Sequence, residues 1–146
     1  KAGRPQAVFS AAVWLDARRG REIYLQDWPA WTRAGLLDAA FVMSYTDDHA
    51  VFKRSLAEGL SHRHGAALIA GVGMFRHDSP TMSLEQLEMA RQMGTNGLCL
   101  FAYHSLFESI SHEQPHTPEA RRLRRRRRAA VKDYLARFCK GRSREH

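Results

Sequence analysis

Apolar residues recur along the chain in four short, nearly continuous runs rather than in strict alternation with polar residues. Runs of this kind are typical of strands in a parallel sheet that is covered on both faces. A pattern of helical periodicity follows each run. The four predicted strands are Ala7–Trp14, Ala40–Thr46, Ala67–Phe75 and Gly97–Tyr103.

Capping signals predict where the helices after these strands begin. Asp and Ser side chains accept hydrogen bonds from the free backbone N–H groups of a first helical turn, and proline fits the first helical position. A serine followed three residues later by glutamine forms a reciprocal capping box. These signals are Asp27 with Pro29, Asp48, the SLEQ segment at 83–86, and Thr117 with Pro118.

Strand–helix units of about 30 residues predict right-handed crossovers in a parallel sheet. The candidates are a doubly wound open sheet, such as a flavodoxin-like domain, and part of a (β/α)8 barrel. A complete barrel needs at least about 200 residues, so four units correspond to half of one. We therefore expect an α/β fold in which residues 1–118 form four βα units of a half TIM barrel and residues 119–146 form an arginine-rich helix that packs on it.

The net charge of +8 lies entirely in the last segment. Residues 1–118 carry 11 lysines and arginines against 12 aspartates and glutamates, whereas residues 119–146 carry 12 against 3. Seven of these arginines lie at 121, 122 and 124–128, where mutual repulsion predicts a solvated or frayed stretch, with firm docking from Ala129. We favour a closing helix with an arginine-rich outer face. The alternative is a non-catalytic domain that binds a polyanion or nucleic acid through this helix.

Other simple signals limit the possibilities further. No apolar stretch is long enough to span a bilayer, and no metal-ligand spacing or cofactor motif is present. The GVG segment at 71–73 lies inside a predicted strand, so close packing explains it better than phosphate binding. Cys99 reads as a buried side chain, and a disulfide with Cys139 is not favoured. The opening KAGRPQAVF has no initiator methionine, so we expect a segment of a longer protein.

Aromatic, carboxylate and hydroxyl side chains follow the carboxyl end of each predicted strand. In parallel α/β folds these ends form one edge of the sheet, and ligands bind there. The content of the edge favours a sugar, because aromatic rings stack on the apolar faces of pyranoses while carboxylates and amides bond to hydroxyls. The candidate stacking residues are Trp14, Trp28, Tyr45, Phe75 and Tyr103, and the candidate hydrogen-bonding residues are Asp16, Gln26, Asp47, Asp48, Asp78 and Ser105.

The order of motifs resembles the C-terminal half of glycosyl-hydrolase-like family ten, a group of barrels related to glycoside hydrolases and often attached to exported bacterial proteins. The resemblance covers about Pro5 to Leu106, and Val42 departs from it where the family usually has proline. The matching positions are Gln26-Asp27-Trp28, Asp38, Met43, Tyr45, Gly71, Gly73, Gln86, Arg91, Gly97, Phe101 and Tyr103.

The resemblance implies hydrolysis of O-glycosyl bonds in a polysaccharide, with the family's first four strands missing from this chain. Glycoside cleavage needs two carboxyl groups, and one of them is expected on the missing half. Asp47 and Asp48 are our first choice for the other, since a carboxyl beside Tyr45 can have a raised pKa, although at least one of the two is expected to cap a helix. Asp16, Asp78 and Glu108 are the other candidates. We expect the chain to be inactive alone. Its unpaired sheet edges predict pairing with the missing half or with a second copy.

Overall fold

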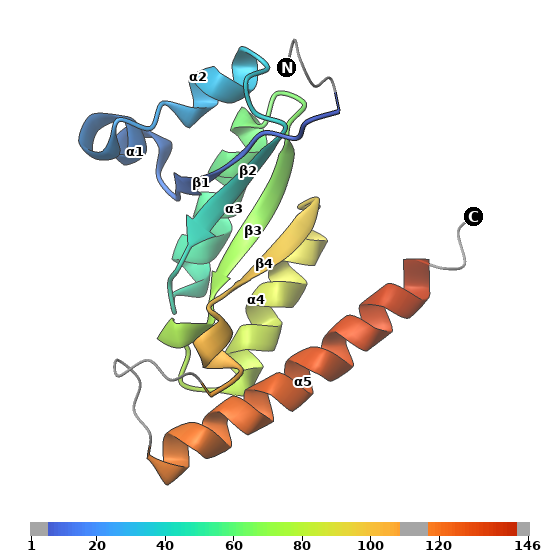
Figure 1. Ribbon diagram of the computed structural model, residues 1–146. Coiled ribbons are helices and arrows are strands. Elements are labelled where there is room, and N and C mark those ends of the chain that lie inside the picture. Colours follow the sequence, from blue (N-terminus) through green and yellow to red (C-terminus); the bar gives the residue numbers. More distant parts are fainter. Residues whose placement is uncertain (1–5, 109–116, 143–146) are drawn as a thin grey trace.

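The structure, a computed structural model, describes residues 6–108 and 117–142, with side chains up to residue 137. It alternates strands and helices along the chain (Figure 1). The elements are β1 (Ser10–Trp14), α1 (Ala17–Tyr24), α2 (Trp28–Arg33), β2 (Ala39–Ser44), α3 (His49–His62), β3 (Ala67–Gly73), η1 (Met74–Arg76), α4 (Pro80–Gln92), β4 (Gly97–Phe101), η2 (Tyr103–Ser105) and α5 (Pro118–Arg142).

The four strands form one parallel sheet in the order β1-β2-β3-β4. All four predicted strands are therefore confirmed, with somewhat shorter ends than the apolar runs. Within the described part of the chain the order does not reverse, so the sheet lacks the switch point of a doubly wound fold. A sequential order of parallel strands is the arrangement found in (β/α)8 barrels.

The core lies between the sheet and the helices on one of its faces. Val13, Val42 and Ala70 are neighbours in adjacent strands and are buried, together with Leu56 of α3 and Leu87 of α4. Figure 1 shows α3 and α4 behind the same face of the sheet, with α5 lying across α4. The sheet therefore has one helix-covered face.

The opposite face of the sheet is apolar but only half-buried in several places. Its middle row consists of Trp14, Met43, Gly71 and Cys99, which pair in register across the four strands. Met43 and Cys99 retain partial exposure, and Cys99 is a free thiol. We expected both faces of the sheet to be covered by helices, and this was wrong for the helices that the structure describes. Their buried side chains all pack on the face that carries Val13, Val42 and Ala70. We call the opposite face of the sheet the open face.

The boundaries of two helices differ from the sequence prediction. α4 begins at Pro80 with Ser79 as its cap, so Ser83 lies inside the helix and is fully buried rather than capping it. In α5, Arg124 and Arg127 are 7% and 3% exposed. Firm docking thus begins several residues before Ala129, contrary to expectation. Cys139, the partner in the disulfide that the sequence did not favour, lies outside the described side chains.

The later part of α5 docks through apolar and polar contacts with the preceding helix. Val131 is buried in the same cluster as Leu87 and Ala90 of α4. The hydroxyl of Tyr134 donates a hydrogen bond of 3.0 Å to Glu88, whose pKa is lowered to about 2, chiefly by its hydrogen bond to Arg91. These contacts fix the long helix across the outside of α4.

Candidate functional site

Five aromatic side chains lie at the edge of the sheet formed by the carboxyl ends of β2, β3 and β4. Tyr45 stacks on Phe101 with 4.8 Å between ring centroids, and Phe75 meets both rings edge-on at 5.8 and 6.0 Å. Tyr103 stacks on Phe107 at 4.7 Å. The loops and short helices that carry these rings lie together at the lower end of the sheet in Figure 1. We call the five residues the aromatic rim.

The aromatic rim exposes an unusual amount of ring surface. Phe75, Phe101 and Tyr103 are 46%, 44% and 67% exposed. Phe75 and Phe101 are in contact, and exposed aromatic surface of this kind is a mark of a binding site, because it leaves apolar area in water until a ligand covers it. Burial raises the pKa of Tyr45, so its phenol stays protonated and can donate a hydrogen bond. The aromatic rim therefore offers both stacking faces and a polar donor.

Two carboxylates follow Tyr45, and they differ in environment. Asp48 caps α3 by accepting hydrogen bonds from the N–H groups of Ala50 and Val51 at 2.7 and 3.0 Å. These two bonds lower the pKa of Asp48, whereas a general acid needs a raised one. The expectation that one of the pair caps a helix is confirmed for Asp48. Asp47 is exposed beside it, and Asp78 is exposed on the loop after η1.

Several predicted site residues near β1 have structural contacts instead. Trp28 is fully buried in the core, with its ring edge-on to His62, so its faces are closed to a ligand in this chain and the prediction of stacking is wrong. Asp16 caps α1 through the N–H of Arg19 at 2.7 Å. Gln26 accepts a hydrogen bond from the backbone N–H of Trp14 at 3.0 Å.

Trp14 keeps some exposure but packs beside α1 rather than in the aromatic rim. Its ring lies 4.4 Å from that of Tyr24, tilted by 34°. Of the predicted stacking residues, Tyr45 and Phe75 share one group of rings, and Tyr103 belongs to a second ring pair on the neighbouring η2. The end of β1 forms a separate surface. Phe101 and Phe107 complete the aromatic rim and were not identified as stacking residues from the sequence.

A network of buried hydrogen bonds joins the segments that carry the aromatic rim. The ring of His77 lies 3.0 Å from the hydroxyl of Ser83 and 3.1 Å from the side-chain oxygen of Gln86. The amide of Gln86 donates to the backbone carbonyl of Thr46 at 2.8 Å, which ties α4 to the loop after β2. A carbonyl oxygen can only accept, so the Gln86 contact favours a proton on Nε2 of His77 and leaves Nδ1 to accept from Ser83.

The same network joins α5 to the sheet edge through a buried arginine. The guanidinium of Arg127 donates to the backbone carbonyl of Ser105 at 3.2 Å and to that of His77 at 2.5 Å. Ser105 itself is buried, and its hydroxyl accepts from the N–H of Ala102 at 3.5 Å. Ser105 thus contributes to the structure of the loop that carries Tyr103, rather than facing solvent as a ligand for sugar hydroxyls.

We expect His77 to make stability depend on pH in a specific direction. Burial lowers its pKa below the ordinary value of 6.5, so from 6.5 down to the folded-state pKa the unfolded chain holds the extra proton. The free energy of unfolding should therefore fall as the pH drops below 6.5, by up to about 1.4 kcal/mol per pH unit from this group. Urea unfolding of the protein and of His77→Asn across this range measures it. Equal slopes in the two proteins would contradict the assignment.

Within the described residues, no group of three or more His, Cys, Asp or Glu side chains is arranged to hold a metal ion, and no helix is both long and apolar enough to cross a membrane.

Three comparisons with known proteins found no relative of this chain. No family model matches the chain, and neither a curated protein nor a solved structure shows significant similarity to it.

Proposed function

We propose that this chain is the carbohydrate-facing C-terminal half of a glycoside-hydrolase-like (β/α)8 barrel that acts on a polysaccharide. The observation that carries the proposal is the aromatic rim, in which three exposed rings stand at the carboxyl ends of parallel strands. Ligands of barrel folds bind at that end of the sheet. Rings at such an edge can stack on pyranose faces, and the order of sequence motifs supports the same family of barrels.

The proposed half-barrel is supported by the sheet. A (β/α)8 barrel places every helix outside and fills its interior with side chains from the other face of the strands. The open face has that apolar character, with Phe41, Met43 and Ile69 half-buried. β1 and β4 each pair with one neighbour among the described strands, so their outer edges are open to a partner. The partner is the missing half-barrel or a second copy of this chain.

Hydrolysis in this proposal requires carboxyl groups from both halves. Retaining enzymes hold two carboxyl groups about 5 Å apart, and inverting enzymes hold them about 6.5–9.5 Å apart. Asp47 is the stronger candidate on this chain, because Asp48 is committed to capping α3. Asp78 is the further candidate for contacts to substrate hydroxyls, since it is exposed on the neighbouring loop. We expect this chain to bind saccharide without cleaving it.

Replacing Tyr103 by alanine should weaken saccharide binding about tenfold, since a stacked aromatic contributes on the order of 1–1.5 kcal/mol. Calorimetric titration of the chain with neutral and uronic hexasaccharides of cell-wall and plant origin measures the affinity. Phe9→Ala is the matched control, because Phe9 is 49% exposed and lies before β1 at the amino edge of the sheet. Equal loss in both variants, or no binding of any saccharide to the unmodified chain, would refute the proposal.

A further inference from the structure

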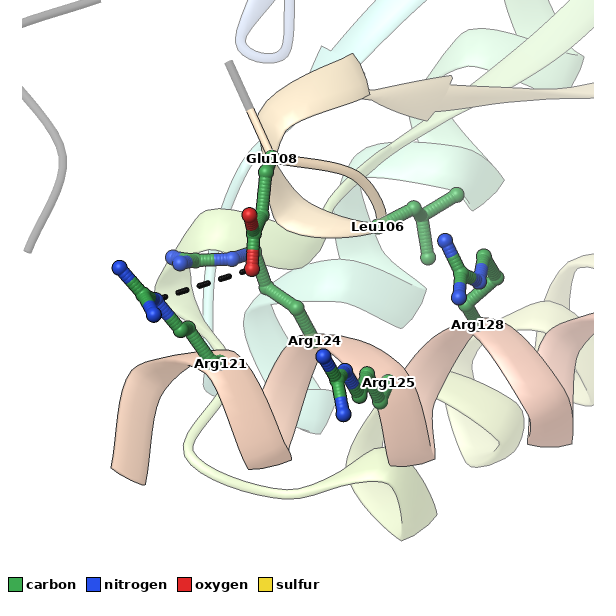
Figure 2. A pocket seen from close by; sticks show the side chains of 6 residues that line it. All are labelled: Leu106, Glu108, Arg121, Arg124, Arg125 and Arg128. Carbon is green, nitrogen blue, oxygen red and sulfur yellow. Dashed lines mark ion pairs between the residues drawn. The ribbon is translucent and has the colours of Figure 1, made fainter. Parts of the chain in front are cut away.

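A pocket of about 220 Å³ lies between the loop after η2 and the first turns of α5. Figure 2 shows the carboxylate of Glu108 above the helix, with Arg121 and Arg124 reaching toward it and Arg125 and Arg128 farther along. Leu106 forms an apolar part of the wall. The pocket is lined by Leu106, Glu108, Arg121, Arg124, Arg125 and Arg128.

Positive charge dominates this pocket. Among the described residues, four guanidinium groups and one carboxylate line the pocket. The ion pair between Arg121 and Glu108 is 3.7 Å long, with both side chains about half exposed. Arg121 and Arg125 are a like-charged pair four residues apart, and such pairs destabilise a helix. Guanidinium groups bind carboxylate, sulfate and phosphate in a bidentate geometry. The pocket therefore matches an oxyanion.

The buried hydrogen bonds of Arg127 hold the part of α5 that carries the pocket in position. Arg127 fixes this stretch of α5 through its hydrogen bonds to the carbonyls of Ser105 and His77. Ser105 directly precedes Leu106 of the pocket wall. The helix backbone that carries the pocket arginines is therefore fixed before an anion binds. Binding then costs less conformational entropy than it would on an undocked helix.

The pocket is continuous with the aromatic rim. The guanidinium carbon of Arg128 lies 5.2 Å above the ring of Phe107, within the range of a cation–π contact. Phe107 in turn stacks on the exposed ring of Tyr103. One extended ligand can therefore contact the stacking surface and the arginines together.

We propose that the arginine pocket binds an anionic substituent, carboxylate or sulfate, of an acidic polysaccharide whose sugar rings stack on the aromatic rim. This inference rests on the proposed function and adds the charge class of its substrate. The remainder of the chain argues against a nucleic acid as the ligand. Residues 1–118 carry a charge balance of −1, so the excess positive charge is confined to the last segment and does not form the long basic groove that tracks a nucleic-acid backbone.

Two double variants with equal charge change separate the pocket from general electrostatic attraction. Arg121→Ala with Arg125→Ala removes two pocket arginines, and Arg122→Ala with Arg126→Ala removes two exposed arginines of the same helix that do not line it. Both pairs have the same spacing, and all four side chains are exposed, so folding should be equally preserved. Titrations of the 146-residue chain would use cellohexaose, a galacturonic acid hexamer, a sulfated hexasaccharide and a single-stranded oligodeoxythymidylate.

We expect an acidic hexasaccharide to bind at least about tenfold more tightly than cellohexaose, and the first double variant alone to abolish that preference. Comparing the carboxylated and sulfated probes identifies the substituent. Equal affinity for neutral and acidic sugars would overturn this inference and leave the proposed function standing. Binding of the oligonucleotide alone would overturn both. Equal losses of affinity for the acidic hexasaccharide in the two double variants would show a diffuse electrostatic attraction to α5. That result would also overturn the assignment of the pocket as the binding site.

Discussion

Replacing Gly71 by alanine is expected to lower the free energy of unfolding by about 3 kcal/mol, because the added methyl group overpacks the sheet. A Cβ atom at this position would lie 2.6 Å from the backbone oxygen of Val42 and 3.2 Å from the ring of Tyr45. The Val42 oxygen belongs to the paired strand β2, so it cannot move away without disturbing the ladder between β2 and β3. Denaturant unfolding monitored by circular dichroism measures the loss.

Gly97→Ala is the matched control for this substitution. Gly97 also lies in a strand, and its added Cβ would meet only the side chain of Ile69, with Cδ1 at 3.1 Å and Cγ2 at 3.9 Å. The end of an isoleucine side chain can shift, so we expect a change within about 1 kcal/mol. If both alanine variants lose the same stability, contact with the Val42 backbone is not the reason for glycine at position 71.

Replacing Arg127 by alanine is expected to cost about 3 kcal/mol as well, through the loss of hydrogen-bond donors. The carbonyls of Ser105 and His77 would lose their contacts to the guanidinium in a buried setting. The alkyl part of the side chain would also leave a gap between α5 and the sheet edge. The same unfolding measurement applies, and saccharide affinity should fall with it because the loop bearing Tyr103 loses its support.

Arg126→Ala provides the control on the neighbouring position. It removes the same charge from the same helix, but Arg126 is exposed. A surface substitution of this kind usually changes stability by less than about 0.5 kcal/mol. A large loss in Arg126→Ala would show that helix charge contributes to the docking of α5. No loss in Arg127→Ala would show that the buried hydrogen bonds of Arg127 do not hold α5 in place.

The strands could be predicted from the sequence because their apolar runs are short, continuous and evenly spaced. The caps at Asp27 and Asp48 were also identified correctly. The first helix was missed because half of residues 17–24 are charged and its buried side consists of the small residues Ala17 and Gly20, which give a weak apolar signal. Its capping residue, Asp16, was interpreted as a ligand. In each case the residues within a few positions of the element decided whether the prediction was right.

The site was predictable where a functional side chain directly follows a strand in the sequence, as Tyr45 does. It was not predictable where contacts join distant segments. His77 and Arg127 are fifty positions apart, and a side chain that donates to a backbone carbonyl leaves no local signal. Trp28 was assigned to the wrong surface for the related reason that a tryptophan at the start of a helix can point either to a ligand or to the core, as it does here.

The sequential strand order has a consequence for how the molecule folds. Each strand pairs with the strand that precedes it in the chain, so the sheet can grow one unit at a time without first closing a long loop. The central β2–β3 ladder, with α3 between its strands in sequence, is the natural nucleus, and β4 with α4 can add to it next. Engineered breaks between units should therefore leave pieces that reassemble when mixed.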